Sequence, residues 1–194
     1  MIKKLLFTLY TTFIFSLLLN NNGLASMSDE KVAAEIANKY NVGETLSEED
    51  QKVILDIMLK NNIVNIKSTA KDEYEINAIS PHGTKYFNSN NRGVNLSGVC
   101  SYNFWKAPVN SYFNCQVGSY KKKGVNNTAT IRHIGYGFGI NKSIIKVYDR
   151  TFSYSAKREY VTVSHAENYS GLVAYGVFIG TAKVDGVSVS QTIQ

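Results

Sequence analysis

The sequence is poor in the residues on which metal binding, redox chemistry and catalysis commonly depend. It has two cysteines and three histidines in 194 residues, and none of His82, His133 and His165 has a second histidine at metal-ligand spacing. It also lacks a glycine-rich phosphate loop, a dinucleotide-binding fingerprint and a Gly-x-Ser-x-Gly nucleophile motif. We therefore predict that the protein binds no metal and no cofactor, and we assign it no catalytic residue.

Long apolar runs are also absent, except at the N-terminus. Met1 to Lys4 is short and basic, Leu5–Leu19 is mainly apolar, and small residues precede a cleavage site after Ala25. The run is about fifteen residues long, shorter than the ~20 residues that a transmembrane helix needs. This layout is typical of a secretory signal peptide. We therefore predict that residues 1–25 direct secretion to an extracellular or cell-surface location, and that the mature chain has no transmembrane span.

Residues 26–62 have the periodicity of two helices. Apolar residues recur at helical spacing on both sides of a break at Asn41–Gly43. Ser47 and Asp50 have the spacing of a capping box, and Asn61–Asn62 ends the second helix. The segment holds eight acidic and four basic side chains, a net charge of −4. We predict an acidic helical segment that is either a cap packed on the rest of the protein or a removable propeptide or interaction arm.

From residue 63 onward apolar and polar residues alternate, which is the period of β-strands. Residues 63–194 have fifteen basic and seven acidic side chains, a net charge of +8. Two short strands flank Lys71-Asp72, residues 80–92 have the composition of a loop, and Asp185-Gly186 is typical of a two-residue hairpin turn. We predict a basic, mainly antiparallel β domain, a sandwich or barrel of about eight strands.

The two cysteines lie in a predicted hairpin, Val94 to Val117. If the chain folds about the Ala107-Pro108 bond, Cys100 faces Cys115 and both strands carry their apolar residues on one face. Opposed cysteines in an antiparallel pair are close enough to bridge, and exported thiols tend to oxidise. We therefore predict a structural disulfide, with a reactive thiol pair as the alternative.

A second hairpin is predicted for Thr128–Tyr148, with an aromatic face and a row of glycines on the opposite face. In this register Gly135 faces Tyr148 and Gly137 faces Lys146. Glycine rows in strands mark bends, bulges or close approach by another group. The glycines therefore accommodate either the cross-strand tyrosine or a ligand.

The densest positive charge in the chain follows the cysteine hairpin. Three consecutive lysines are typical of a solvated turn, and they also suit contact with phosphate-bearing polymers or lipid head groups. We predict a secreted, non-enzymatic binding protein that acts at an anionic extracellular or cell-envelope surface. Its partner is an anionic cell-surface polymer or lipid rather than a specific nucleic acid. The candidate contacts are Lys121, Lys122, Lys123, Lys142 and Lys146.

Two other functions fit the sequence. The protein is a membrane-active toxin or bacteriocin-like protein if the aromatic face of the second hairpin enters a bilayer. It is a secreted hydrolase if His133, or a pair such as Asp149 and Glu159, works in a cleft. The opposite charges of the two parts further suggest that the acidic segment screens the basic domain.

Overall fold

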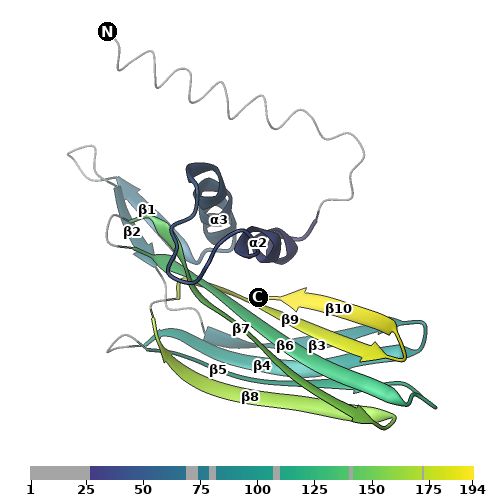
Figure 1. Ribbon diagram of the computed structural model, residues 1–194. Coiled ribbons are helices and arrows are strands. Elements are labelled where there is room, and N and C mark those ends of the chain that lie inside the picture. The colour runs from purple at the N-terminus through teal and green to yellow at the C-terminus, as the bar shows by residue number, and fades with distance from the viewer. Residues whose placement is uncertain (1–26, 69–73, 79–81, 107–109, 140–141, 172) are drawn as a thin grey trace, which may run out of the picture.

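A computed structural model describes residues 27–68, 74–78, 82–106, 110–139, 142–171 and 173–194. The predicted signal peptide, the turn at Ala107-Pro108 and the turn residue Asn141 lie outside these residues. The described chain is mostly antiparallel β-structure, with two helices near the N-terminus (Figure 1).

The helices are α2 (Asp29–Ala37) and α3 (Glu48–Lys60). The strands are β1 (Val64–Ser68), β2 (Tyr74–Ala78), β3 (His82–Asn91), β4 (Val94–Lys106), β5 (Asn110–Tyr120), β6 (Asn126–Phe138), β7 (Ile144–Lys157), β8 (Tyr160–Ser170), β9 (Tyr175–Val184) and β10 (Val187–Ile193). The predicted helix start is confirmed, because the Ser47 hydroxyl accepts a hydrogen bond from the Asp50 amide at 3.2 Å.

Eight of the strands form two four-stranded antiparallel sheets that face each other. The first sheet has the order β3-β4-β5-β8 and the second sheet has the order β10-β9-β6-β7, while β1 and β2 pair separately. The predicted antiparallel sandwich is therefore confirmed. The predicted loop at residues 80–92 is wrong, because β3 occupies most of it. In this edge strand Phe87 alone is buried, so the sequence shows no apolar alternation.

The predicted disulfide is confirmed and lies in the core between the sheets. Cys100 pairs with Cys115 across β4 and β5, and the sulfur atoms are 2.02 Å apart. Both residues are fully buried and pack with core side chains such as Phe113 and Val117. The bond therefore joins two central strands of the first sheet at its buried face.

Replacing Cys100 and Cys115 together by alanine is expected to lower the free energy of unfolding by about 3 kcal/mol. The bridge spans a sequence separation of 15 residues and restricts the unfolded chain. Urea denaturation of the variant and of the wild-type protein measures the difference. Wild-type protein held under a thiol reductant is the control and should lose a similar amount. A loss under 1 kcal/mol would contradict the prediction.

The helical segment packs on one end of the second sheet, on the face away from the first sheet (Figure 1). Ile54 and Met58 of α3 share a buried cluster with Tyr136 and Tyr175 of the sheet. Residues 43–46, between the helices, also join the start of β7 through backbone hydrogen bonds of 2.7 to 3.1 Å. The segment and the second sheet therefore share a hydrophobic core and a backbone ladder.

A β-bulge sets the register of the predicted second hairpin. Gly135 faces Tyr148 as predicted, but the register then shifts, so Tyr136 pairs with Lys146 and Gly137 with Ile145. The predicted Gly137–Lys146 pair is therefore wrong. The shift moves Lys146 to the face covered by the helices. The aromatic face of this hairpin is buried there, since Tyr136 is fully enclosed.

The antiparallel order sorts the connections to two ends of the sandwich. The turns β3–β4, β5–β6, β7–β8 and β9–β10 lie at one end. In the first sheet Tyr120 lies beside Asn95 and Tyr160, and in the second sheet Asn126 lies beside Lys157 and Asp185. The helices lie at the other end. The start of the described chain and the C-terminus both lie near α2, away from the four turns (Figure 1).

Candidate functional site

Two of these four turns are joined by hydrogen bonds. The Lys121 amide donates to the Glu159 carbonyl at 3.1 Å, and the Lys123 amide donates to the Glu159 carboxylate at 3.0 Å. Asn126 at the start of β6 also pairs with Lys157 at the end of β7. The β7–β8 turn therefore lies against the predicted lysine cluster and adds two cations to it.

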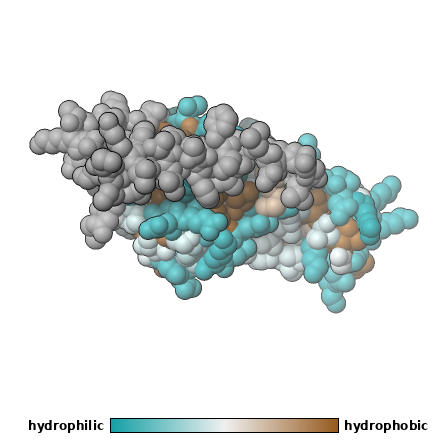
Figure 2. Space-filling view, turned by 90° about the horizontal axis from the view of Figure 1, so that it is seen from above, coloured by the Kyte–Doolittle hydropathy of each residue, from teal (hydrophilic) through white to brown (hydrophobic). Residues whose placement is uncertain are grey.

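We call this group the basic end; it consists of Lys121, Lys122, Lys123, Lys157 and Arg158. Four of its side chains are exposed and the first is partly buried. None of the ion pairs among the described residues involves any of them. Hydrophilic residues dominate the rim of this end, on the right in Figure 2. The basic end thus presents five cations outside any ion pair of the described chain, with the carboxylates of Glu159 and Asp185 as the nearby anions.

The carboxylates nearest the basic end hold the backbone of the turns. Asp185 accepts hydrogen bonds from the amides of Asn126 at 2.8 Å and Val125 at 3.2 Å. These two bonds, together with the charge of Lys121, lower the pKa of Asp185 below its usual range. Glu159 accepts from Lys123 as described. The two anions therefore fix the shape of the site.

The lysine turn itself has little freedom. The Gly124 amide donates to the Lys121 carbonyl at 2.9 Å, and Lys123 adopts a left-handed conformation with φ of 64°. A Cβ atom at Gly124 would come within 2.3 Å of a Val184 methyl group, so only glycine fits there. The lysines are thus displayed from a turn that is packed on the sandwich.

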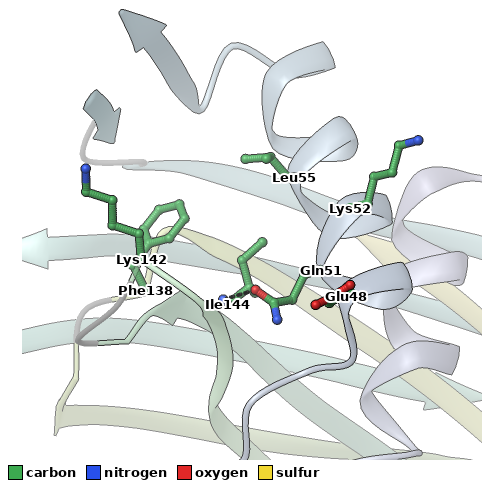
Figure 3. A pocket seen from close by; sticks show the side chains of 7 residues that line it. All are labelled: Glu48, Gln51, Lys52, Leu55, Phe138, Lys142 and Ile144. Atoms are coloured by element: carbon green, nitrogen blue, oxygen red, sulfur yellow. Dashed lines mark hydrogen bonds between the residues drawn. The ribbon is translucent and has the colours of Figure 1, made fainter. Parts of the chain in front are cut away.

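Lys142, the fourth predicted contact, lies at the opposite end of the molecule. It lines a pocket of about 240 Å³ between α3 and the β6–β7 connection (Figure 3). Glu48, Gln51 and Leu55 line the same pocket from the helix. Lys142 therefore belongs to the surroundings of the acidic segment and does not join the other lysines.

The prediction that Lys146 is an exposed contact, the fifth of the set, is wrong. Its side chain is 6% exposed, and its ammonium group donates to the Ala37 carbonyl and to the Asp149 carboxylate, both at 3.0 Å. The bulge in β6–β7 places it there. It stabilises the last carbonyls of α2, where the helix dipole favours a cation.

Lys157 and Arg158 were not predicted as contacts from the sequence. They stand more than thirty positions beyond the lysine cluster in the sequence, and only the pairing of β6 with β7 and of β5 with β8 brings them to it. The sequence feature that could have indicated them is the length of the β6–β7 hairpin. Counting its register back from the turn places the end of β7, with Lys157, beside the start of β6, which follows the lysines.

A second group of ionisable side chains lines a cavity of about 220 Å³ beside β7 and β8. Glu167 accepts hydrogen bonds from the Tyr148 hydroxyl at 2.5 Å and from the Arg150 guanidinium at 2.9 Å. Asp149 and Tyr169 line the same cavity. This arrangement is the nearest that the described residues come to the predicted hydrolase.

The two carboxylates of this cavity are held as anions. Burial would raise the pKa of each, but hydrogen bonds from Tyr148 and His165 to Glu167, and from cations to Asp149, outweigh it and lower both pKa values. Neither is therefore suited to donate a proton at neutral pH. The suggested pair of Asp149 and Glu159 is wrong, because the eight residues of β7 from Asp149 to Lys157, roughly 26 Å of strand, separate Asp149 from the turn that holds Glu159.

No known protein family and no curated protein matches the chain. Within the described ranges, no three His, Cys, Asp or Glu residues are grouped so that they could hold a metal ion. A helix long and apolar enough to cross a membrane is likewise not found in that part of the chain. The basic end is the site from which we infer function.

Proposed function

We propose that the protein is secreted and binds an anionic extracellular or cell-envelope surface through the basic end, without catalysing a reaction. The observation that carries this proposal is the gathering of five cations at one end of the sandwich, none of them in an ion pair within the described chain. Such a cluster attracts anionic polymers and head groups.

The chemistry recognised is the phosphate group, whether it belongs to a cell-wall polymer or to a lipid. Each lysine or arginine near an anionic membrane contributes about 1 kcal/mol, and the attraction fades within a Debye length of ~8 Å at physiological salt. Exposed side chains on a fixed turn can reach several phosphates at once. The contributions of the five side chains should therefore add, and binding should weaken steeply as salt increases.

Replacing Lys122 and Lys157 by glutamine should weaken binding about 10- to 30-fold, because two cations of about 1 kcal/mol each are lost. The matched control replaces Lys31 of α2 and Lys142 by glutamine, which removes the same net charge far from the basic end. Sedimentation with phosphatidylglycerol vesicles, phosphatidylcholine vesicles and phosphate-bearing cell-wall polymer measures the affinities at low and high salt.

The two anionic arms of this experiment distinguish the sources of phosphate. Salt-sensitive binding to vesicles alone points to lipid, and salt-sensitive binding to the polymer alone points to the cell wall. If the control pair weakens binding as much as the Lys122 and Lys157 pair, net charge rather than the basic end is responsible and the proposal is wrong. Absence of binding in every arm also overturns it.

The acidic segment lies too far from the basic end to screen it strongly. Eight residues of β6 separate Asn126 at the basic end from Ile134 beneath the helices, roughly 26 Å at 3.3 Å per residue. This is about three Debye lengths at physiological salt. Replacing Glu48 and Glu49 by glutamine should thus change affinity for anionic vesicles less than twofold, and a larger gain would support the screening suggested by the charge asymmetry.

A further inference from the structure

The outward face of the first sheet is rich in amides, hydroxyls and tyrosines. Its strands alternate strictly, so Phe87, Leu96 and Val117 point into the core while their neighbours point out. The register groups the outward residues into five rows of four, and the row farthest from the basic end is His82, Asn103, Tyr112 and Asn168. The other four rows are Asn90, Asn95, Tyr120 and Tyr160; Asn88, Ser97, Gly118 and Thr162; Tyr86, Val99, Gln116 and Ser164; Thr84, Ser101, Asn114 and Ala166.

None of these sixteen residues, which we call the neutral face, is Asp, Glu, Lys, Arg or His. Protein surfaces suited to remain soluble and free of partners carry roughly 25–35% charged residues of mixed sign. The neutral face instead offers amides, hydroxyls and tyrosines. It is polar enough to form many hydrogen bonds, and it has no charge that a partner would have to neutralise.

Three tyrosines rise from the neutral face. The exposed fractions of Tyr86, Tyr160 and Tyr120 are 70%, 51% and 37%. A Cβ atom at Gly118 would come within 2.9 Å of the Tyr160 hydroxyl, so glycine makes room for this ring to lie across the strand. The same sheet buries the rings of Phe87 and Phe113 in the core but leaves these three tyrosine rings in water. Exposed large rings grouped on one face indicate contact with a partner.

The helices do not cover this face. They pack on the second sheet, on the opposite side of the sandwich (Figure 1). The neutral face is also distinct from the basic end, which is formed by turns beyond the ends of its strands. A ligand could therefore lie along the sheet without touching the helices.

We propose that the neutral face binds an uncharged polysaccharide. Sugar hydroxyls both donate and accept hydrogen bonds, as amide side chains do, and the apolar faces of sugar rings suit flat contact with tyrosine. A neutral chain also meets no uncompensated charge on this surface. An anionic chain would find no cation to pair with among the sixteen uncharged side chains, which distinguishes this site from the basic end.

The test measures retention of the purified protein by insoluble cellulose, chitin and starch, and its retardation in native gels that contain a soluble neutral glucan. Tyr86→Ala, Tyr160→Ala and Gln116→Glu are the variants, and Gln116→Glu adds one charge to the face at nearly unchanged shape. Tyr154→Ala removes a tyrosine of similar exposure, 46%, from β7 and is the matched control. Each face variant should weaken binding about tenfold.

Binding through the neutral face should persist in 1 M salt and be unchanged by Lys122→Gln with Lys157→Gln, so its failure and that of the proposed function are distinguishable. No retention by any of the three solids and no retardation in the gels would overturn the proposal. Equal weakening by Tyr154→Ala would also overturn it. A dimer that sediments as such and is broken by Gln116→Glu would assign the face to a second copy of the chain instead.

Discussion

Replacing Asp149 by alanine is expected to lower the free energy of unfolding by about 3–5 kcal/mol. The carboxylate accepts hydrogen bonds from two guanidinium nitrogens of Arg132, both at 2.8 Å, and from the Lys146 ammonium at 3.0 Å. The Lys146 side chain is 6% exposed, so loss of the anion leaves a buried cation with only a carbonyl partner. Leaving a buried charge without its counterion has a cost of this size.

In the Asp149→Ala variant, unfolding should begin where the helices meet the second sheet. Arg132 also donates to the Asn38 side chain at 2.8 Å, and Lys146 donates to the Ala37 carbonyl, so both cations hold the end of α2. Amide hydrogen exchange should speed up first in the helical segment, and later in the disulfide hairpin. Uniform acceleration across the chain would show that the segment does not unfold separately.

Two further variants separate lost charge pairing from lost volume. Asp56→Ala removes an exposed carboxylate from α3 and should change stability by less than about 0.5 kcal/mol. Asp149→Leu combined with Lys146→Met removes the carboxylate and its most buried cation, leaving the partly exposed Arg132, and should recover much of the loss, because a buried pair exchanged for apolar side chains is often neutral. If the double variant is no more stable than Asp149→Ala, packing rather than the stranded charge explains the effect.

Stability should fall by about 2 kcal/mol between pH 8 and pH 5 because of His133 alone. The ring is fully buried, and burial lowers its pKa to about 3. Its Nδ1 lies 3.3 Å from the Val177 carbonyl, which can only accept, so Nδ1 carries the proton and Nε2 accepts from the Tyr169 hydroxyl at 2.9 Å. The folded protein therefore requires the neutral ring.

The direction in which stability changes with pH follows from the protons bound by each state. The unfolded chain protonates His133 near pH 6.5, while the folded chain does so only near pH 3. Between these values the unfolded state binds more protons, so stability decreases as the pH falls, at about 1.4 kcal/mol per pH unit. Urea denaturation at several pH values measures the slope. His133→Gln should be less stable throughout but should lose most of the slope above pH 5; an unchanged slope would assign it to other groups.

Features set by neighbouring residues in the chain were predictable from the sequence. Ser47 and Asp50 fixed the start of α3, and Asp185-Gly186 gave the β9–β10 turn, with φ of 48° and 84°. Alternation on both sides of the cysteines was sufficient to place Cys100 opposite Cys115. In each case a few adjacent side chains determine the backbone, so the local pattern carries the information.

Features that depend on pairing between distant strands were not predictable. β3 is an edge strand with a single buried side chain, and its pattern therefore resembles a loop. The bulge after Gly135 has no sequence signal stronger than the glycine itself, yet it moves Lys146 from solvent to the interior. The basic end needed the register of two strand pairs, β6 with β7 and β5 with β8, before Lys157 and Arg158 could be added to it.

The separation of the four turns from the chain termini determines how the molecule is oriented when it is attached through one terminus. The described chain starts beside α2, and its C-terminus lies close by (Figure 1). A tag, fusion partner or immobilising linker at either terminus would thus hold the molecule by its helical end and leave the turns pointing outward. Sensor surfaces loaded through one terminus should display the molecules in one orientation, and a natural attachment at the same place would extend the turns away from their support.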